Sequence, residues 1–330
     1  MKRLFLLAAI LLIFHEITFS QSDVPASKPI AEIFTDFHVN LVKGSANTSG
    51  FGLNRAYIGY NYALNKNFFA VLILNLASPD ELAKGSKARR YAYFREASMN
   101  YANDRLNITM GMIKTTTFIF QQNWWGMRYL AKPIQDWYCY GTDSDLGISV
   151  NYKFSNILEA DFSLVNGEGG GNLELDNNLK SAGGLTLRPS ENVTVRLYSD
   201  VMKNKNVWQN TSLLFAGYRS KNFFLGAEFD YKTNLDTING HNAWGVSATG
   251  GVNLSEKILF FSRYDLARSV VPAGENVNWN KRNDGIFYIL GVQYSISKAV
   301  RIAIDYQSKL PDDNSKPNGN MIYLNLVMKI

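Results

Sequence analysis

The chain is poor in the residues that build disulfides and metal sites, with one cysteine and three histidines among its 330 residues. Cys139 cannot form a disulfide within a single chain. His15, His38 and His241 are expected in a leader, a strand and a loop respectively, so they show no metal-ligand spacing. No serine–histidine pairing suited to nucleophilic catalysis is visible either. We therefore expect a protein that is not an enzyme and carries no cofactor.

Long hydrophobic runs and clusters of one charge are also missing. Beyond residue 20 no apolar run reaches about 18 residues, which argues against a membrane-spanning helix. Membrane strands are not excluded, because each needs only about 10 residues and their signal lies in alternation. The net charge of +6 is spread along the chain, without the Lys/Arg clusters that bind nucleic acid. With 8 prolines and no Pro/Gly/Ser-rich linker, the chain is expected to form one domain.

The first residues, MKRLFLLAAILLIFHEITFSQS, have the layout of a secretory signal peptide. Two basic residues precede an apolar run that is too short to span a bilayer, and the small residues Thr18 and Ser20 stand before a cleavage site. We expect residues 1–20 to be removed and residues 21–330 to form a single exported domain.

Apolar and polar residues alternate along most of the remaining chain. In MIYLNLVMKI, residues 321–330, every second side chain from Ile322 to Ile330 is apolar, while the residues between include tyrosine, asparagine and lysine. Such alternation predicts a strand with one apolar and one polar face. The pattern predicts about sixteen strands, at residues 30–43, 51–64, 68–77, 89–102, 106–114, 145–154, 157–165, 178–188, 193–202, 210–219, 223–232, 243–254, 258–267, 285–296, 299–308 and 320–330.

The connections between these strands alternate in length. Very short polar turns, such as NKN at 65–67 and SEK at 255–257, are followed by longer connections. This is typical of a barrel with one rim in the periplasm and the other outside. We therefore expect an all-β fold, a transmembrane antiparallel β-barrel of about sixteen strands in which the last strand closes against the first. A soluble β protein with an aromatic core is the alternative. The longer connections are predicted at residues 44–50, 78–88, 115–144, 166–177, 203–209, 233–242, 268–284 and 309–319.

One connection, KTTTFIFQQNWWGMRYLAKPIQDWYCYGTDSD from Lys114 to Asp145, is unusually long and aromatic. The interior of about sixteen strands is too wide for side chains alone to fill and should hold water. This third extracellular loop is therefore expected to fold inward and narrow the channel, showing Arg128, Lys132 and Asp136 to a passing solute. An aromatic cap on the outer rim or at a subunit contact is the alternative.

Charged residues are also expected on the inward face of the strands. Four arginines and one lysine are the predicted pore-lining cations: Arg55, Arg196, Arg263, Arg301 and Lys114. Carboxylates on the same face balance them, so the mixture predicts either a transverse field across a constriction or a salt-bridged lining. These carboxylates are Glu96, Glu159, Asp161, Asp200, Glu228, Asp230, Asp265 and Asp305.

Several segments resemble the phosphate-selective O and P type porins, in the version common among Bacteroidetes. They are RAYIGYNYALNKNFFAVLILN, GMIKTTTFIFQQNWWGMRYL, SDLGISVNYKF and FSLVNGEGGG. The resemblance implies a sixteen-stranded, trimeric outer-membrane channel with an inward third loop and with luminal arginines and lysines that attract anions. The chain departs from the family in being short, in ending at Ile330 where many outer-membrane proteins end in Phe, and in lacking a continuous arginine ladder.

Together these patterns predict an outer-membrane porin for passive diffusion of small hydrophilic solutes, leaning toward phosphate or other anions. Its expected partners are outer-membrane lipid, the solute and two further copies of the chain in a homotrimer, with no nucleic acid. Two alternatives stay open: an exported β-rich protein that docks a carbohydrate on its aromatics, and a structural or adhesive barrel with a plugged lumen.

Overall fold

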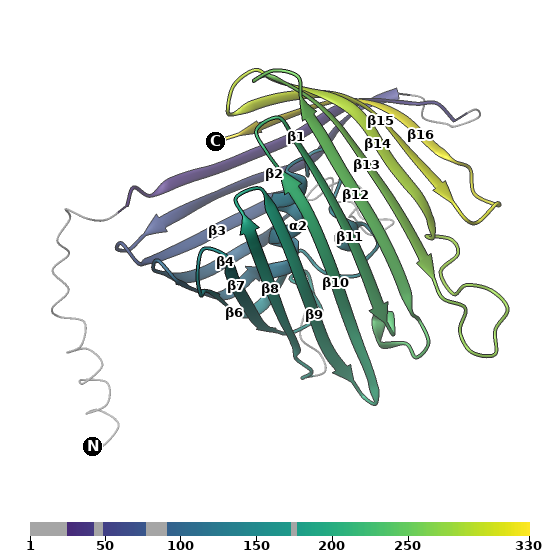
Figure 1. Ribbon diagram of the computed structural model, residues 1–330, viewed down its shortest axis with the longest axis horizontal. Coiled ribbons are helices and arrows are strands. Elements are labelled where there is room, and N and C mark those ends of the chain that lie inside the picture. Colours follow the sequence, from purple (N-terminus) through teal and green to yellow (C-terminus); the bar gives the residue numbers. More distant parts are fainter. Residues whose placement is uncertain (1–24, 43–48, 77–90, 173–176) are drawn as a thin grey trace.

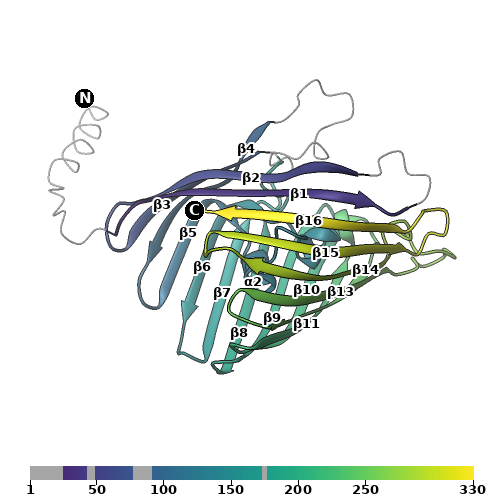
Figure 2. The same cartoon turned by 90° about the horizontal axis from the view of Figure 1, so that it is seen from above.

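The computed structural model describes residues 25–42, 49–76, 91–172 and 177–330. It is a closed barrel of antiparallel strands in which β16 pairs with β1 and every other strand pairs with its neighbours in the chain (Figures 1 and 2). This confirms the predicted all-β barrel of sixteen strands. The strands are β1 Lys28–Asn40, β2 Ser49–Ala63, β3 Phe68–Leu76, β4 Ala92–Ala102, β5 Leu106–Lys114, β6 Ser144–Lys153, β7 Leu158–Val165, β8 Lys180–Ser190, β9 Val193–Asn204, β10 Val207–Arg219, β11 Phe223–Thr233, β12 Ala243–Asn253, β13 Ile258–Ser269, β14 Gly285–Ser295, β15 Val300–Pro311 and β16 Gly319–Lys329.

The alternation in the sequence separates an apolar outer wall from a mixed interior. On β2, Tyr57 is 3% exposed and points inward, while its neighbour Ile58 is 62% exposed on the outer wall. Outward leucines, isoleucines, phenylalanines and methionines repeat this on almost every strand. A soluble protein rarely exposes apolar patches larger than a few hundred Å², so a wall of this kind is suited to lipid. The structure therefore favours the membrane barrel over the alternative prediction of a soluble β protein.

The last strand, β16, has an apolar outer face and is paired on both sides. Ile322, Leu324 and Leu326 are 39%, 50% and 37% exposed on the outer wall. The backbone of β16 is paired with β15 on one side and with β1 on the other, beginning at Glu32 opposite Lys329. Closure thus joins the first and last strands, so neither end of the sheet is left as an open edge, which hydrocarbon does not tolerate.

Within the described ranges, turn lengths follow the prediction at all but one position; the longer connections expected at 44–50, 78–88 and 166–177 lie wholly or partly outside these ranges. The rim at residues 65–67, 103–105, 191–192 and 220–222, called here the short-turn rim, carries tight turns, and the opposite rim carries the longer loops. The longer connection expected at 203–209 is wrong. Strand β9 continues to Asn204 and β10 begins at Val207, and Lys205 adopts a left-handed φ of 52°, as a two-residue hairpin turn requires.

The long fifth connection folds inward, as predicted. It contains helix α2, Thr116–Trp125, and helix α3, Ile134–Trp137, and Figures 1 and 2 show α2 inside the ring of strands. Gly126 ends α2 with a φ of 69°. Two inward glycines of the wall, Gly217 and Gly226, leave the space that the Trp124 indole fills, since a Cβ at either position would overlap it. A cap on the outer rim is therefore excluded.

Two further features complete the described fold. A short 3-10 helix, η2 Leu235–Thr237, lies in the loop between β11 and β12. No helix in the described ranges is long and apolar enough to cross a membrane.

Candidate functional site: the narrowed lumen

Buried hydrogen bonds hold one side of the inward loop to strand β11. The amide of Gln121 donates to the carboxylate of Glu228 at 2.5 Å, and that of Gln135 donates to Asp230 at 2.6 Å. Beside them, the buried Lys232 ammonium donates to the backbone oxygen of Tyr140 at 3.0 Å. Each contact satisfies a group that would be costly to bury alone. The loop is therefore fixed on this wall by several buried hydrogen bonds.

The other side of the loop reaches strands β13, β14 and β15. Tyr129 donates its hydroxyl to Gln293 on β14 at 2.7 Å, and Gln307 on β15 donates to the backbone oxygen of Leu130 at 3.3 Å. Trp137 stacks on Phe287 with ring centroids 4.6 Å apart. The loop thus crosses the lumen from β5 and β6 to β11, β14 and β15, which leaves much less open space than an unobstructed barrel of this size.

Two cavities remain beside the loop, along β1, β2, β15 and β16. The outer cavity, about 340 Å³, lies toward the longer loops and is lined by Asn54 and Tyr323 among others. The inner cavity, about 160 Å³, includes Glu32 and Lys329 at the short-turn ends of their strands. Both cavities are lined by the same three residues, Phe34, Arg128 and Tyr129. These three side chains therefore lie between the two spaces, and their position is called here the narrow point.

The charged residues that line this path are mainly cations. The outer cavity contains Arg55, Arg128 and Lys132, and the inner cavity contains Arg128 again together with Arg301 and Lys329. The one carboxylate that lines either cavity is Glu32, which pairs with Lys329 at 2.7 Å. Among the described residues no carboxylate lies within ion-pair distance of Arg301, whose guanidinium is 5.3 Å from the centre of the Tyr129 ring.

Arg128 lies at the narrow point but is less available than the sequence predicted. Its side chain is 5% exposed and pairs with Asp136 at 2.9 Å and with Asp143 at 3.4 Å. Lys132, with 38% of its side chain exposed, also pairs with Asp136 at 3.3 Å. Burial alone would raise the pKa of Asp136, but the charges of Arg128, Lys132 and Arg55 outweigh it and hold that pKa below its usual value. Asp136 therefore faces these cations and does not line either cavity.

The remaining predicted cations point inward but lie outside both cavities. Arg196 is bonded to Asp161 at 2.6 Å, Arg263 to Asp265 at 2.6 Å and Lys114 to Glu96 at 2.7 Å. They form the salt-bridged lining that was one of the two predicted arrangements. The sequence did not single out Phe34, Tyr129, Glu32 or Lys329 as members of the path, although their alternation placed the strand residues on the inward face.

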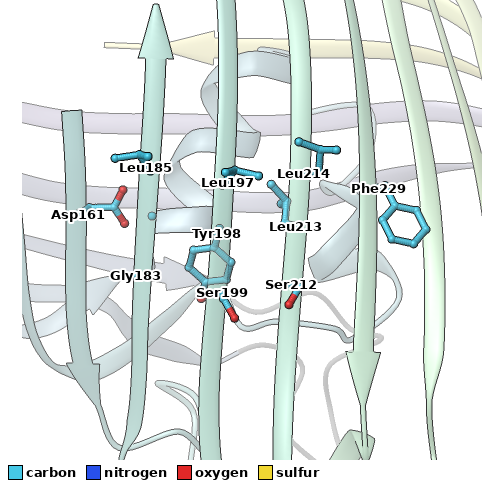
Figure 3. Close-up of a pocket in the computed structure, with 11 residues that line it drawn as sticks. Asp161, Gly183, Leu185, Leu197, Tyr198, Ser199, Ser212, Leu213, Leu214 and Phe229 are labelled. Atoms are coloured by element: carbon cyan, nitrogen blue, oxygen red, sulfur yellow. The ribbon is translucent and has the colours of Figure 1, made fainter. Parts of the chain in front are cut away.

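A larger hollow is on the outer wall, away from this path. It measures about 600 Å³ and lies over β8, β9 and β10, where Gly183 has no side chain to fill the space between Leu185, Leu197 and Leu214 (Figure 3). Because these leucines belong to the lipid-facing set, we do not regard this hollow as a site for a hydrophilic solute. Nor do the described residues contain a group of three His, Cys, Asp or Glu side chains that could hold a metal ion.

Comparison with known proteins gives a likeness in fold. No family model matches the chain, and no curated protein is similar to it. OmpF of Salmonella typhi, in a complex with daunomycin, has 12% identity and a TM-score of 0.70 over 92% of this chain and 97% of its own. The anion-selective porin from Comamonas acidovorans has 11% identity and a TM-score of 0.65, over 92% and 99%. OmpT of Vibrio cholerae, in its trimer form, has 11% identity and a TM-score of 0.61, over 92% and 99%. A closed barrel with an apolar outer wall and this fold points to the outer membrane.

Proposed function

We propose that the chain is a passive diffusion channel of a bacterial outer membrane, for small hydrophilic solutes. The observation that carries this proposal is the pair of polar cavities that meet at Phe34, Arg128 and Tyr129 inside a closed barrel. Cavities of about 340 and 160 Å³ have room for small solutes. The general likeness to outer-membrane porins supports the same function.

We further propose that the channel prefers anions. The cations around the two cavities outnumber the carboxylates that line them, and a charge in a confined, weakly screened space raises the local concentration of counter-ions. One fold neighbour is described as an anion-selective porin. Selectivity for phosphate, and membership of the phosphate-selective O and P type porins of Bacteroidetes, remain predictions from the sequence resemblance.

The assembly and processing of the chain are also proposals. A homotrimer agrees with the resemblance, and one fold neighbour is described in a trimer form. The leader at residues 1–20 lies outside the described residues, so its removal and the domain at residues 21–330 remain predictions.

The selectivity is tested with the purified channel in a planar bilayer under a KCl gradient. Arg301→Glu should shift the reversal potential toward cations, lowering the anion-to-cation permeability ratio about twofold or more at low salt, because it reverses a charge without a carboxylate partner. Lys203→Glu, a matched change on the outward face of β9, should leave the ratio unchanged. A cation preference in the unmodified channel, or equal effects of the two variants, would refute the anion proposal.

A plugged structural barrel is the second candidate, because the loop crosses the lumen and is bonded to Arg95 on β4 at one side and to Glu228 on β11 at the other. The same bilayer recording separates the two functions. Absence of conductance steps from correctly inserted protein would reject the channel and favour the plug. The carbohydrate-binding alternative has less support, since Trp125 is buried and Trp137 is stacked within the barrel.

A further inference from the structure

Three amide side chains of the wall line the outer cavity, and each is tied to a buried carboxylate. Asn54 donates to Asp36 at 2.7 Å. Gln307 and Asn325 donate to the two oxygens of Asp305, at 2.9 and 2.7 Å. The two carboxylates are buried and do not line the cavity, whereas the three amides do, so the carboxylates lie behind the amides.

The carboxylates fix which end of each amide faces the cavity. An ionised carboxylate only accepts hydrogen bonds, so it draws the NH₂ end of each amide toward itself and turns the oxygen away. Within the described ranges no donor is bonded to the side-chain oxygens of Asn54, Gln307 or Asn325. The wall of the outer cavity therefore presents hydrogen-bond acceptors.

The positions of the carboxylates are themselves fixed. His38 lies 2.7 Å from the second oxygen of Asp36, and Gly52 leaves room for that carboxylate, because a Cβ at this position would overlap it. Both oxygens of Asp305 are already bonded. The amides are thus held by carboxylates that are themselves bonded and do not line the cavity, which makes the orientation of the amides a stable property of the wall.

Cations of the loop line the same cavity. Lys132 is the most exposed of them, with 38% of its side chain accessible, and Arg128 lies beside it. One space of about 340 Å³ therefore combines positive charge from the loop with acceptor oxygens from the wall. A chloride ion or a plain fatty acid could use the first feature but not the second.

We propose that the outer cavity is a binding site for a small carboxylic acid that also carries hydrogen-bond donors, either hydroxyl or ammonium groups, at its other end. The acid group pairs with the loop cations while its donors pair with the amide oxygens. A plain carboxylate of the same length displaces water from these oxygens without replacing the lost hydrogen bonds, so it binds more weakly. This inference rests on the proposed channel function and names its class of solute.

Three six-carbon probes test the proposal, added on the side of the longer loops while KCl current is recorded from the full channel. Hexanoate has no donor at its far end, gluconate has hydroxyls, and 6-aminohexanoate has an ammonium group. We expect gluconate, 6-aminohexanoate or both to reach half-block at a concentration about fivefold lower than hexanoate, the effect of one net hydrogen bond. The stronger of the two identifies hydroxyl or ammonium as the preferred donor. Equal block by all three, or strongest block by hexanoate, would overturn the site.

Substitutions locate the effect within the cavity. Asn54→Leu removes one acceptor at nearly constant size and should reduce the discrimination against hexanoate to about half or less. Asn61→Leu, on the same strand but outside both cavities, is the matched control and should leave it unchanged. Lys132→Met should weaken block by all three acids. If Asn54→Leu does not insert, Asn54→Ser, a smaller change at an exposed position, tests the same acceptor.

The outcome also separates this inference from the channel function. Anion-selective conductance with equal block by the three probes would reject the acid site and keep the channel. Absence of conductance would reject the channel itself. Preserved discrimination in Asn54→Leu, with loss in the Asn61→Leu control, would place recognition elsewhere in the lumen and contradict the assignment.

Discussion

Replacing Trp125 tests whether the inward loop sets the size of the path. This side chain is 3% exposed, its ring lies 6.4 Å from that of Phe261 in an edge-on arrangement, and its indole donates to the backbone oxygen of Ala131 at 3.2 Å. Truncating a buried tryptophan to alanine costs about 3–5 kcal/mol. The strand pairing of the barrel does not involve Trp125, so this cost falls on the docking of the loop. This free energy is comparable to that of two or three of the hydrogen bonds between the loop and β11.

We therefore expect Trp125→Ala to form a barrel whose loop is undocked for part of the time. Single-channel conductance should rise, and trypsin should cut after Arg128, whose side chain is 5% exposed and therefore protected in the docked loop. Trp208→Ala is the matched control, because Trp208 is 57% exposed on the outer wall. An inserted Trp125→Ala channel with the conductance and protease pattern of the unmodified protein would show that the loop does not limit the path.

Two further predictions concern the outer wall and the loop charges. Leu324→Arg, on the lipid face of β16, should lower the free energy of unfolding by about 2–4 kcal/mol, measured by urea titration of the barrel in lipid vesicles, and a change below about 0.5 kcal/mol would mean that this wall does not face hydrocarbon. The lowered pKa of Asp136 predicts a loop that loses stability only in acid: the contribution is complete above the unfolded value, about 4, and disappears as pH falls through the lower folded value. Protease protection of the loop should accordingly be constant from about pH 7 to pH 5 and fall below about pH 4; loss of protection already between pH 7 and pH 5 would exclude Asp136 as the cause.

The barrel could be predicted from the sequence because lipid and lumen impose opposite demands on successive residues of a strand. Tyr57 and Ile58 show this contrast directly, and closure through β16 followed from the apolar positions of its outward face. The hairpin at Lys205 could not be predicted in the same way. The polar residues around Lys205 favour a loop by composition. Strands that extend beyond the bilayer also carry polar residues on both faces, so polarity alone does not mark the turn.

The inward course of the loop was also predictable, from its length and its aromatic content. Its anchors were not. Gln121 and Glu228 are 107 residues apart, Gln135 and Asp230 are 95 apart, and a glutamine carries no sequence signal that names its partner. Gly217 and Gly226 likewise look unremarkable in a strand until Trp124 is seen to occupy the space above them.

A charged side chain that points into the barrel does not necessarily act on a solute. Arg263 and Asp265 are two residues apart on one strand and therefore share its inward face, so their ion pair could be predicted from the spacing. Because Asp265 neutralises its charge, Arg263 is not expected to act on a solute. Arg301 and Asp305 also share a face, but they are four residues apart, about 13 Å along the strand, and do not pair. Asp305 is engaged by Gln307 and Asn325, while Arg301 lies over the Tyr129 ring. The loop adds to this difference, because it brings Tyr129 to Arg301 and leaves a cavity beside that arginine. A cation of the wall can thus act on a solute where the loop leaves space beside it and where, among the described residues, no carboxylate pairs with it. Arg301 meets both conditions, which is why its replacement, and not that of Arg196 or Arg263, is the decisive test of selectivity.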